Sequence, residues 1–281
     1  MSHARIIVLT TLALLAFAGN SLLCRAALAR THIDAASFTT VRLVSGALVL
    51  WMLVRLRGGA AAGKGSFLSA LALFAYAAGF SFSYLRLSAA AGALILFGAV
   101  QATMIAWGLW KGERLRPAQL LGLLLACAGL AGLLLPGLSA PPLASALLML
   151  GAGMAWGVYS VRGRGAGDAL KVSAGNFLLA AAMALALSAL LLRGASFDPM
   201  GIWYAFLSGA ITSGLGYAVW YTALPFLAST SAAAVQLSVP VLAALGGIAF
   251  LDEPLTLRLL AASIAIVGGI ALVILAGKRR A

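Results

Sequence analysis

Residues 93–135 read ALILFGAVQATMIAWGLWKGERLRPAQLLGLLLACAGLAGLLL: an apolar stretch, a short charged turn and a second apolar stretch rich in small residues. The same order returns 140 positions later, in residues 233–275. Without a gap, Glu113 of the turn WKGERLR aligns with Glu253 of the turn FLDEPLT. Elsewhere the identity is little above what two segments rich in Ala, Leu and Gly share by chance. The acidic turn between two apolar helices therefore carries the signal, which predicts a membrane protein built from two related halves.

The composition excludes a soluble fold. Of the 281 residues, 63% are hydrophobic and 9% are charged, and the mean hydropathy is +1.08; a soluble domain carries about 25% charged residues. Cys24 and Cys127 both lie in apolar runs, so they indicate neither a disulfide framework nor a metal site. The formal charge of +13 more often reports orientation than nucleic-acid binding in a membrane protein. No nucleic acid, metal or cofactor is expected.

The chain divides into ten apolar spans, each near the ~20 residues that a bilayer core requires. Charge, glycine and proline form the breaks between them. We expect an all-α integral membrane protein of ten transmembrane helices, with one five-helix unit in residues 1–138 and a second in residues 139–281. The predicted spans are Ile6–Cys24, Ala36–Val54, Phe67–Leu87, Ala91–Trp110, Ala118–Leu135, Leu143–Val161, Val172–Leu192, Gly201–Tyr221, Ser229–Leu251 and Leu257–Ala276.

Lysine and arginine are distributed unevenly over the two sides of these spans. Thirteen lie on the side that holds both termini and five on the other. Because cytoplasmic loops are the more basic ones, we expect a bacterial inner-membrane protein with both termini in the cytoplasm. Each half has five spans, an odd number, so the second half must enter the membrane upside down. Such an inverted repeat suits a carrier, since exchanging the conformations of the two halves exchanges the open face.

Ten spans, a duplicated five-span unit and a Glu-x-Leu turn near the end of each unit resemble the EamA-type drug/metabolite transporter superfamily. Arg42, within FTTVRL of the second span, and Pro240, within LSVP of the ninth, are further matches. The resemblance covers about residues 6–276. Within the superfamily, the chain is most similar to the bacterial aromatic amino-acid exporters. The chain departs from the pattern at Val100, which stands where Pro240 would have a counterpart, and at residues 17–20, FAGN, in place of a Trp-Gly opening.

The resemblance implies a secondary transporter that exports amino acids, aromatic ones among them, or related small metabolites by alternating access. Its partners would be the small-molecule substrate and the lipid bilayer, and a monomer would suffice. The alternatives are an exporter of another small metabolite or drug-like compound, and a non-transporting membrane scaffold or receptor. An enzyme is not expected, because intramembrane catalysis needs a nucleophile–base pair, paired carboxylates or metal ligands. No Asp, Glu or His lies in the middle of a span, which also favours a facilitator or exchanger over a proton-coupled pump.

Arg42 lies well inside its predicted span, roughly 12 Å below the outer boundary at about 1.5 Å per residue. A charge at that depth is costly and normally faces a cavity or a partner. Two interpretations follow. Arg42 meets a substrate carboxylate or lends positive potential to the translocation path, or it is structural and bonds helix carbonyls and neighbours such as Asn20 or Asn176.

Aromatic and polar side chains predict a substrate cavity, because rings with one polar edge can stack on an apolar substrate while hydrogen-bonding a zwitterion. The candidates are Tyr76, Phe80 and Tyr84, which form an i, i+4, i+8 stripe, together with Gln101, Trp107, Trp156, Tyr159, Tyr217 and Gln236. Aromatic residues near span ends are also typical of anchors at the membrane interface. We assign that role to Trp110, Trp203, Tyr204, Trp220 and Tyr221.

Glycine and proline predict the moving parts. Gly214 and Gly216 in the eighth span and Pro240 in the ninth are candidate hinges, because a proline frees a backbone carbonyl and permits a kink. In the fifth and tenth spans we expect close helix packing instead. The small-residue pairs there are Ala128/Gly132 and Ala265/Gly269.

Overall fold

The computed structural model describes residues 1–58, 65–112, 114–137, 140–163, 168–227, 232 and 235–277. Every regular element in these segments is a helix. The first half contributes α1 (His3–Arg30), α2 (Ala35–Leu56), α3 (Phe67–Tyr84), α4 (Ala89–Trp110) and α5 (Pro117–Leu134). These helices coincide with the first five predicted spans, except that α1 continues past Cys24 to Arg30.

The eighth predicted span is not a regular α-helix. The eighth span is a continuous run of α8 (Pro199–Leu207), the π-helical η2 (Ser208–Leu215), α9 (Gly216–Ala223) and η3 (Leu224–Phe226). π-Helical stretches inside α-helices are rare overall, and many of those that occur lie at functional sites. The other elements are α6 (Leu143–Gly163), α7 (Ala169–Leu190), the short η1 (Leu192–Gly194), α11 (Ser238–Leu251) and α12 (Leu257–Gly277).

The helices have the length and composition of membrane spans. Among the described residues, nine helices are long and apolar enough to cross a bilayer, and α11 is a shorter apolar helix. The expected all-helical, multi-pass architecture is confirmed. The predicted ninth span is described only at residue 232 and from residue 235 onward. The expected acidic turn at Glu113 also lies outside the described residues.

Carboxylates mark where several helices begin. Asp34 accepts hydrogen bonds from the backbone amides of Ala36 and Ser37 at the start of α2. Asp168 caps α7 in the same way, and Asp198 caps α8, which begins with Pro199. Such caps satisfy amides that have no partner in the first turn. The acidic residues therefore sit at the helix ends, where the chain meets water.

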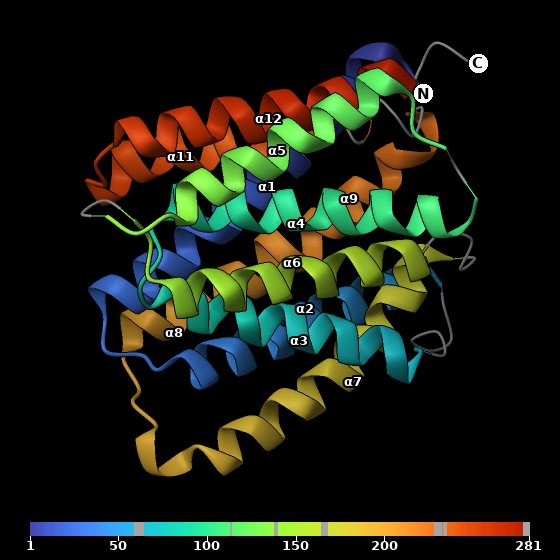
Figure 1. Cartoon of the computed structure of the whole chain (residues 1–281). Helices are drawn as coiled ribbons and strands as arrows, with labels where there is room; N and C mark the ends of the chain where they lie inside the picture. Colours follow the sequence, from blue (N-terminus) through green and yellow to red (C-terminus); the bar gives the residue numbers. More distant parts are fainter. Residues whose placement is uncertain are drawn as a thin grey trace.

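The helices lie roughly side by side (Figure 1). α1 contacts α11, α9, η2 and α8. Elsewhere in the bundle, α6 packs against both α3 and α4. Three further pairs join positions that the sequence repeat makes equivalent: α2 packs on α7, α4 on α11 and α5 on α12.

The contact between α5 and α12 depends on glycine. A Cβ added at Gly122 would meet the carbonyl oxygen of Gly269, and one added at Gly129 would meet Ala265 and Ile266. The expected close packing of these two spans is present, and Ala265 and Gly269 take part in it. The first predicted pair is not at the contact in full, since a Cβ at Gly132 would meet no atom within 4 Å. The contact face of α5 is set by Gly122 and Gly129.

The outside of the bundle is apolar. Many leucines are exposed along the helices, among them Leu120, Leu121 and Leu124 on α5 and Leu178 and Leu185 on α7. In water such a surface would drive association, whereas lipid tails are as apolar as leucine. The molecule is a multi-pass membrane protein.

Candidate functional site: a cavity with one closed end

A cavity of about 300 Å³ lies inside the bundle, at the lower end of the ~300–1,000 Å³ typical of small-molecule sites. Helices α1, α3, α4 and α6, the α8–η3 span and the segment before α11 all contribute to its wall. Its lining residues are Phe17, Asn20, Ser21, Tyr76, Phe80, Leu96, Phe97, Gln101, Met104, Trp156, Ser160, Gly163, Thr212, Tyr217, Trp220, Tyr221, Leu224, Leu227, Ala232 and Gln236.

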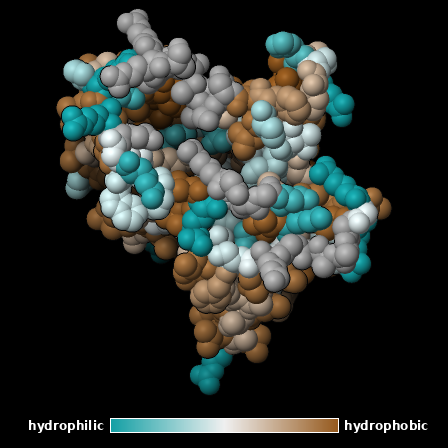
Figure 2. All heavy atoms as spheres, turned by 90° about the vertical axis from the view of Figure 1, so that its right-hand side faces the viewer, coloured by the Kyte–Doolittle hydropathy of each residue, from teal (hydrophilic) through white to brown (hydrophobic). Residues whose placement is uncertain are grey.

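Among the described residues, the lining of the cavity extends toward one end of the bundle. Gly163 and Leu227 line it at the ends of α6 and η3, on the side where α1 begins and α12 ends (Figure 1). Figure 2 looks onto this side, where hydrophilic side chains gather around the helix ends. Toward the opposite side the lining stops at Ser21 and Phe80. One turn further, Cys24 and Tyr84 are fully buried, so packed side chains close this end.

One wall of the cavity is a chain of aromatic rings. The Trp156 ring lies 4.8 Å from Tyr76 and 5.2 Å from Tyr217, measured between ring centroids. Phe17 of α1 continues the chain with edge contacts to Tyr217 and Trp220. Helices α3, α6, α9 and α1 thus join their rings into a single surface. Flat apolar groups stack well on such a surface.

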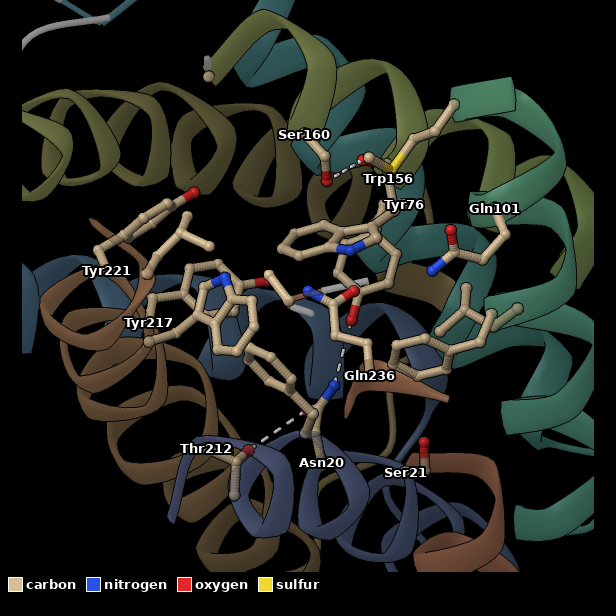
Figure 3. A pocket seen from close by; sticks show the side chains of 18 of the residues that line it. Asn20, Ser21, Tyr76, Gln101, Trp156, Ser160, Thr212, Tyr217, Tyr221 and Gln236 are labelled. Atoms are coloured by element: carbon tan, nitrogen blue, oxygen red, sulfur yellow. Dashed lines mark hydrogen bonds between the residues drawn. The ribbon is translucent and has the colours of Figure 1, made fainter. Parts of the chain in front are cut away.

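Two amides face the aromatic wall. Gln101 of α4 and Gln236 both reach into the cavity (Figure 3). Neither side chain hydrogen-bonds to another described residue, although Gln101 is a buried residue. Both amides are therefore free to bind polar groups of a ligand.

The closed end of the cavity holds a polar network around Asn20. Ser208 of η2 donates a hydrogen bond to Asn20 Oδ1 at 2.7 Å. Asn20 Nδ2 donates to the Tyr76 hydroxyl at 3.2 Å (Figure 3). These two partners determine which way the amide of Asn20 points. The same Tyr76 hydroxyl accepts a second hydrogen bond, from Arg42 Nη2 at 2.9 Å.

Arg42 stands behind this network, outside the cavity wall. It is 2% exposed, and its guanidinium lies 5.1 Å from the centre of the Tyr76 ring and 4.8 Å from that of Phe80. Its Nε donates to Ser213 at 3.4 Å, while Nη1 has no partner among the described residues. No described carboxylate pairs with it. The expectation of direct contact with a substrate does not hold in this conformation, because Tyr76 and Phe80 cover the guanidinium.

Six of the predicted cavity residues line the cavity: Tyr76, Phe80, Gln101, Trp156, Tyr217 and Gln236. Tyr84 lies beyond the closed end, where its hydroxyl donates to the carbonyl of Ala89. Tyr159 is buried and lines a smaller, neighbouring cavity of about 210 Å³. Trp107 is not among the residues that line either cavity. It is 40% exposed on the outside of α4, against Trp110 and below the Lys111 amine, as an interface anchor would be.

The opposite correction applies to α9. Trp220 and Tyr221 were expected at the membrane interface, but both line the cavity, and Trp220 is only 7% exposed. Trp110 and Trp203 are exposed as expected. Phe17, Asn20, Ser160 and Thr212 also line the cavity and were not among the candidates. An asparagine within an apolar span was the signal for one of them.

The predicted hinge residues lie at irregular places in the helices. Gly214 is the last residue but one of the π-helical η2, and Gly216 begins α9. Gly209, also in η2, lies so close to α2 that an added Cβ would collide with Ser45 and the carbonyl of Arg42. Pro240 is in the first turn of α11, not in the middle of a kinked helix. The interruption falls three residues earlier, at Leu237, because a proline cannot bond to the carbonyl four residues before it.

Ion pairs hold the closed end together. Arg25 Nε bonds to Glu253 Oε1 at 3.0 Å, and the two side chains are 21% and 11% exposed. Glu253 Oε2 accepts from the amide of Ala89 at 2.8 Å, and Arg25 Nη1 donates to the carbonyl of Tyr84 at 2.9 Å. We call these four residues the clasp. It ties the C-terminal part of α1 to the start of α4, the end of α3 and the turn after α11.

Beside the clasp, Asp34 joins two loops of the same side. Its backbone amide donates to the carbonyl of Ser196, and the amide of Ser196 donates to Asp34 Oδ2 at 3.0 Å. Partial burial opposes ionisation of this carboxyl, but hydrogen bonds from Ser37, Ser196 and Ala36 outweigh it. The pKa of Asp34 therefore lies below its ordinary value.

Comparison with known proteins gives three similarities. Residues 143–275 match the EamA-like transporter family. A Pseudomonas aeruginosa protein described as uncharacterized is 58% identical over 275 residues, which cover 98% of this chain and 96% of that protein. A crystal structure described simply as that of a protein matches with a TM-score of 0.70 at 21% identity, over 99% of this chain and 100% of the other. This last similarity concerns the fold alone.

Proposed function

Because the chain belongs to the family of its Pseudomonas aeruginosa relative, and its residues 143–275 form an EamA-like transporter domain, we propose that it is a secondary carrier of small metabolites. The first candidates are amino acids, aromatic ones among them, moved out of the cytoplasm by alternating access. The family consists of membrane transporters, so an intramembrane enzyme is not supported. The narrower choice of substrate rests on the cavity.

The observation that carries this proposal is access from one side only. The cavity extends to the side of both termini, whereas Cys24, Tyr84 and the clasp close the other side. A channel would need a path open at both ends. A binding site closed at one end is what an alternating-access carrier has in one of its two states.

The inward orientation follows from charge. On the side of the termini the described residues include Arg5, Arg55, Arg57, Lys111, Arg114, Arg116, Arg162 and Lys171. The clasp side holds fewer basic residues, and two of them, Arg25 and Arg30, are paired with Glu253 and Asp252. By the positive-inside rule the termini lie in the cytoplasm of a bacterial inner membrane. The cavity is then open to the cytoplasm, where an exporter loads its substrate.

The packing supports two inverted five-helix repeats, residues 1–138 and 139–281. An inverted repeat has a two-fold axis in the membrane plane, and helices next to that axis pack on their own counterparts. The pairs α2 with α7, α4 with α11 and α5 with α12 have this relation. The two mobile parts of the carrier would be the η2 region, with Gly214 and Gly216, and the interruption before Pro240.

The described part of the membrane region offers no proton-loading carboxylate. Asp34, Asp168, Asp198, Asp252 and Glu253 all lie at helix ends. Proton-coupled carriers usually hold such a group inside the bilayer. We therefore propose a facilitator or exchanger that follows the gradient of its substrate.

The test is uptake of labelled phenylalanine, tryptophan and a panel of other amino acids into proteoliposomes, with and without an imposed pH gradient. Saturable uptake without the gradient is expected. A matched pair of variants links it to the site: Trp156→Ala in the wall lowers uptake, whereas Leu185→Ala on the exposed side of α7 leaves it unchanged. Accumulation driven by the pH gradient alone would overturn the coupling proposal. Absence of flux for every amino acid, with folded protein, would overturn the substrate class.

A further inference from the structure

The closed end of the cavity has hydrogen-bond donors left to offer. A phenolic oxygen has two lone pairs and one proton. In Tyr76 both lone pairs are occupied, by Arg42 Nη2 at 2.9 Å and Asn20 Nδ2 at 3.2 Å. Its proton has no acceptor among the described residues. Asn20 also has an unused donor. Its oxygen accepts from Ser208, and only one of its two N–H groups donates to another described residue. Both residues line the cavity.

A positive charge stands directly behind these donors. Arg42 is 2% exposed, and no carboxylate of the described residues pairs with it. Its Nη1 is buried without a hydrogen-bond partner. An uncompensated cation in a low-dielectric interior makes the nearby potential positive and strengthens the donors bonded to it. A negatively charged group is therefore expected to bind to these donors more strongly than water does.

We propose that the Asn20–Tyr76 end of the cavity binds the carboxylate of the substrate, with Arg42 acting as a positioning residue through Tyr76. This inference rests on the proposed carrier function and gives the substrate its chemical class: a small carboxylate with a flat apolar part. The carboxylate accepts from the Tyr76 hydroxyl and from the free N–H of Asn20. The apolar part then lies along Trp156 and Tyr217, toward the cytoplasmic end.

This arrangement discriminates against amines at the same end. An ammonium group offers donors where the site already offers donors, and it would face the charge of Arg42. A neutral amide can supply one acceptor, but it forgoes the charge-assisted hydrogen bonds, which are roughly twice as strong as neutral ones. The preference should therefore follow the carboxylate and not the net charge or the ring.

Four probes that share a phenyl ring separate these terms: phenylalanine, 3-phenylpropanoate, phenylalanine amide and phenethylamine. Binding is measured on the purified full chain by competition with labelled phenylalanine. The wild-type protein should bind the first two at least tenfold more tightly than the last two. Equal affinity for all four, or preference for the amines, would overturn the inference and leave a carrier of aromatic compounds standing. If none of the four binds, the inference and the aromatic substrate class both fail.

Three variants locate the effect. Tyr76→Phe and Arg42→Gln should each bring the ratio between phenylalanine and phenethylamine close to one, by weakening phenylalanine and leaving phenethylamine unchanged. Arg42→Lys keeps the charge and should keep part of the ratio. A purely structural role would weaken all probes together, and that result would contradict the assignment. The wild-type probe series decides the matter even where a variant fails to fold.

The matched control is Tyr204→Phe. It removes the same hydroxyl group from a tyrosine of α8 that is not among the residues lining the cavity. It should leave the ratio between phenylalanine and phenethylamine as in the wild type. Loss of the ratio in this variant too would show that the preference does not arise at the Asn20–Tyr76 end.

Discussion

The two ends of the cavity differ in the side chains that form them and in how those side chains interact. At the end on the side of the termini, aromatic rings and two amides line an open approach. At the other end, the Asn20 network, packed Cys24 and Tyr84 and the clasp join four helices through polar contacts. We propose a division of labour in which one end holds the apolar part of the substrate, and the other end anchors its carboxylate and keeps the cavity closed on that side.

The largest effect is expected where the closed end has no space at all. Gly209→Ala would push a Cβ against Ser45 and the backbone of Arg42, and backbone cannot give way as a flexible side chain can. Overpacking of this kind costs about 1–3 kcal/mol or more, so folded protein should be lost or its melting temperature should fall strongly.

Gly151→Ala is the matched control in α6. An added Cβ there meets nothing within 4 Å, and alanine is the better helix former by roughly 0.5–1 kcal/mol. Its melting temperature should equal or exceed that of the wild type. Equal behaviour of the two variants would refute the close approach of η2 to α2.

The clasp can be broken without touching the cavity. Glu253→Gln removes the charge that holds Arg25 and should favour the state open to the outside. Cys24 lies between the cavity and the clasp, so its reaction with a membrane-impermeant maleimide, in a Cys127→Ser background, reports that opening. We expect labelling about tenfold faster, which corresponds to about 1.4 kcal/mol. Unchanged labelling would mean that the packing at Cys24 and Tyr84 closes this end by itself.

Substrate binding at the open end can be weakened separately, and the same Cys24 labelling then serves as the control. Trp156→Ala removes a ring that contacts Tyr76 and Tyr217. Aromatic pairs contribute about 0.5–1.5 kcal/mol beyond their buried area, so the KM for phenylalanine should rise by about tenfold. Cys24 labelling should stay as in the wild type. A change in labelling as large as that of Glu253→Gln would erase the proposed division between the two ends.

The smallest effect is that of pH on the closed end. The pKa of Asp34 is lowered in the folded protein, so its contribution to stability is present above the unfolded pKa and is lost as the pH falls through the folded pKa. Asp34→Asn keeps an N-cap of similar quality but does not titrate. Thermal melts between neutral and acidic pH should show the wild type losing its advantage on acidification. A constant difference between the two proteins would contradict this role for Asp34.

The positions of the helices were predictable, and the directions of their side chains were not. Hydropathy, charge and proline placed α2 to α7 to within a few residues. Spans that are apolar on every side do not reveal which side faces lipid. Trp107 was therefore expected in the cavity and Trp220 at the membrane interface, whereas Trp107 is exposed and Trp220 lines the cavity. The hydrogen bonds of Arg42 depend on Ser213, 171 positions away in sequence. The glycines pointed to an unusual eighth span, but a π-helical register follows from its packing against α2.

The burial of Arg42 also constrains how the protein is made. An arginine at the centre of a membrane helix costs about 2.5–3.5 kcal/mol on insertion. Tyr76 and Phe80, whose rings cover its guanidinium, lie on the very next helix, whereas Ser213 is synthesised far later. During translation, α3 is thus the first partner that can shield this charge. Residues 35–84 are best regarded as a hairpin that enters the bilayer as one unit.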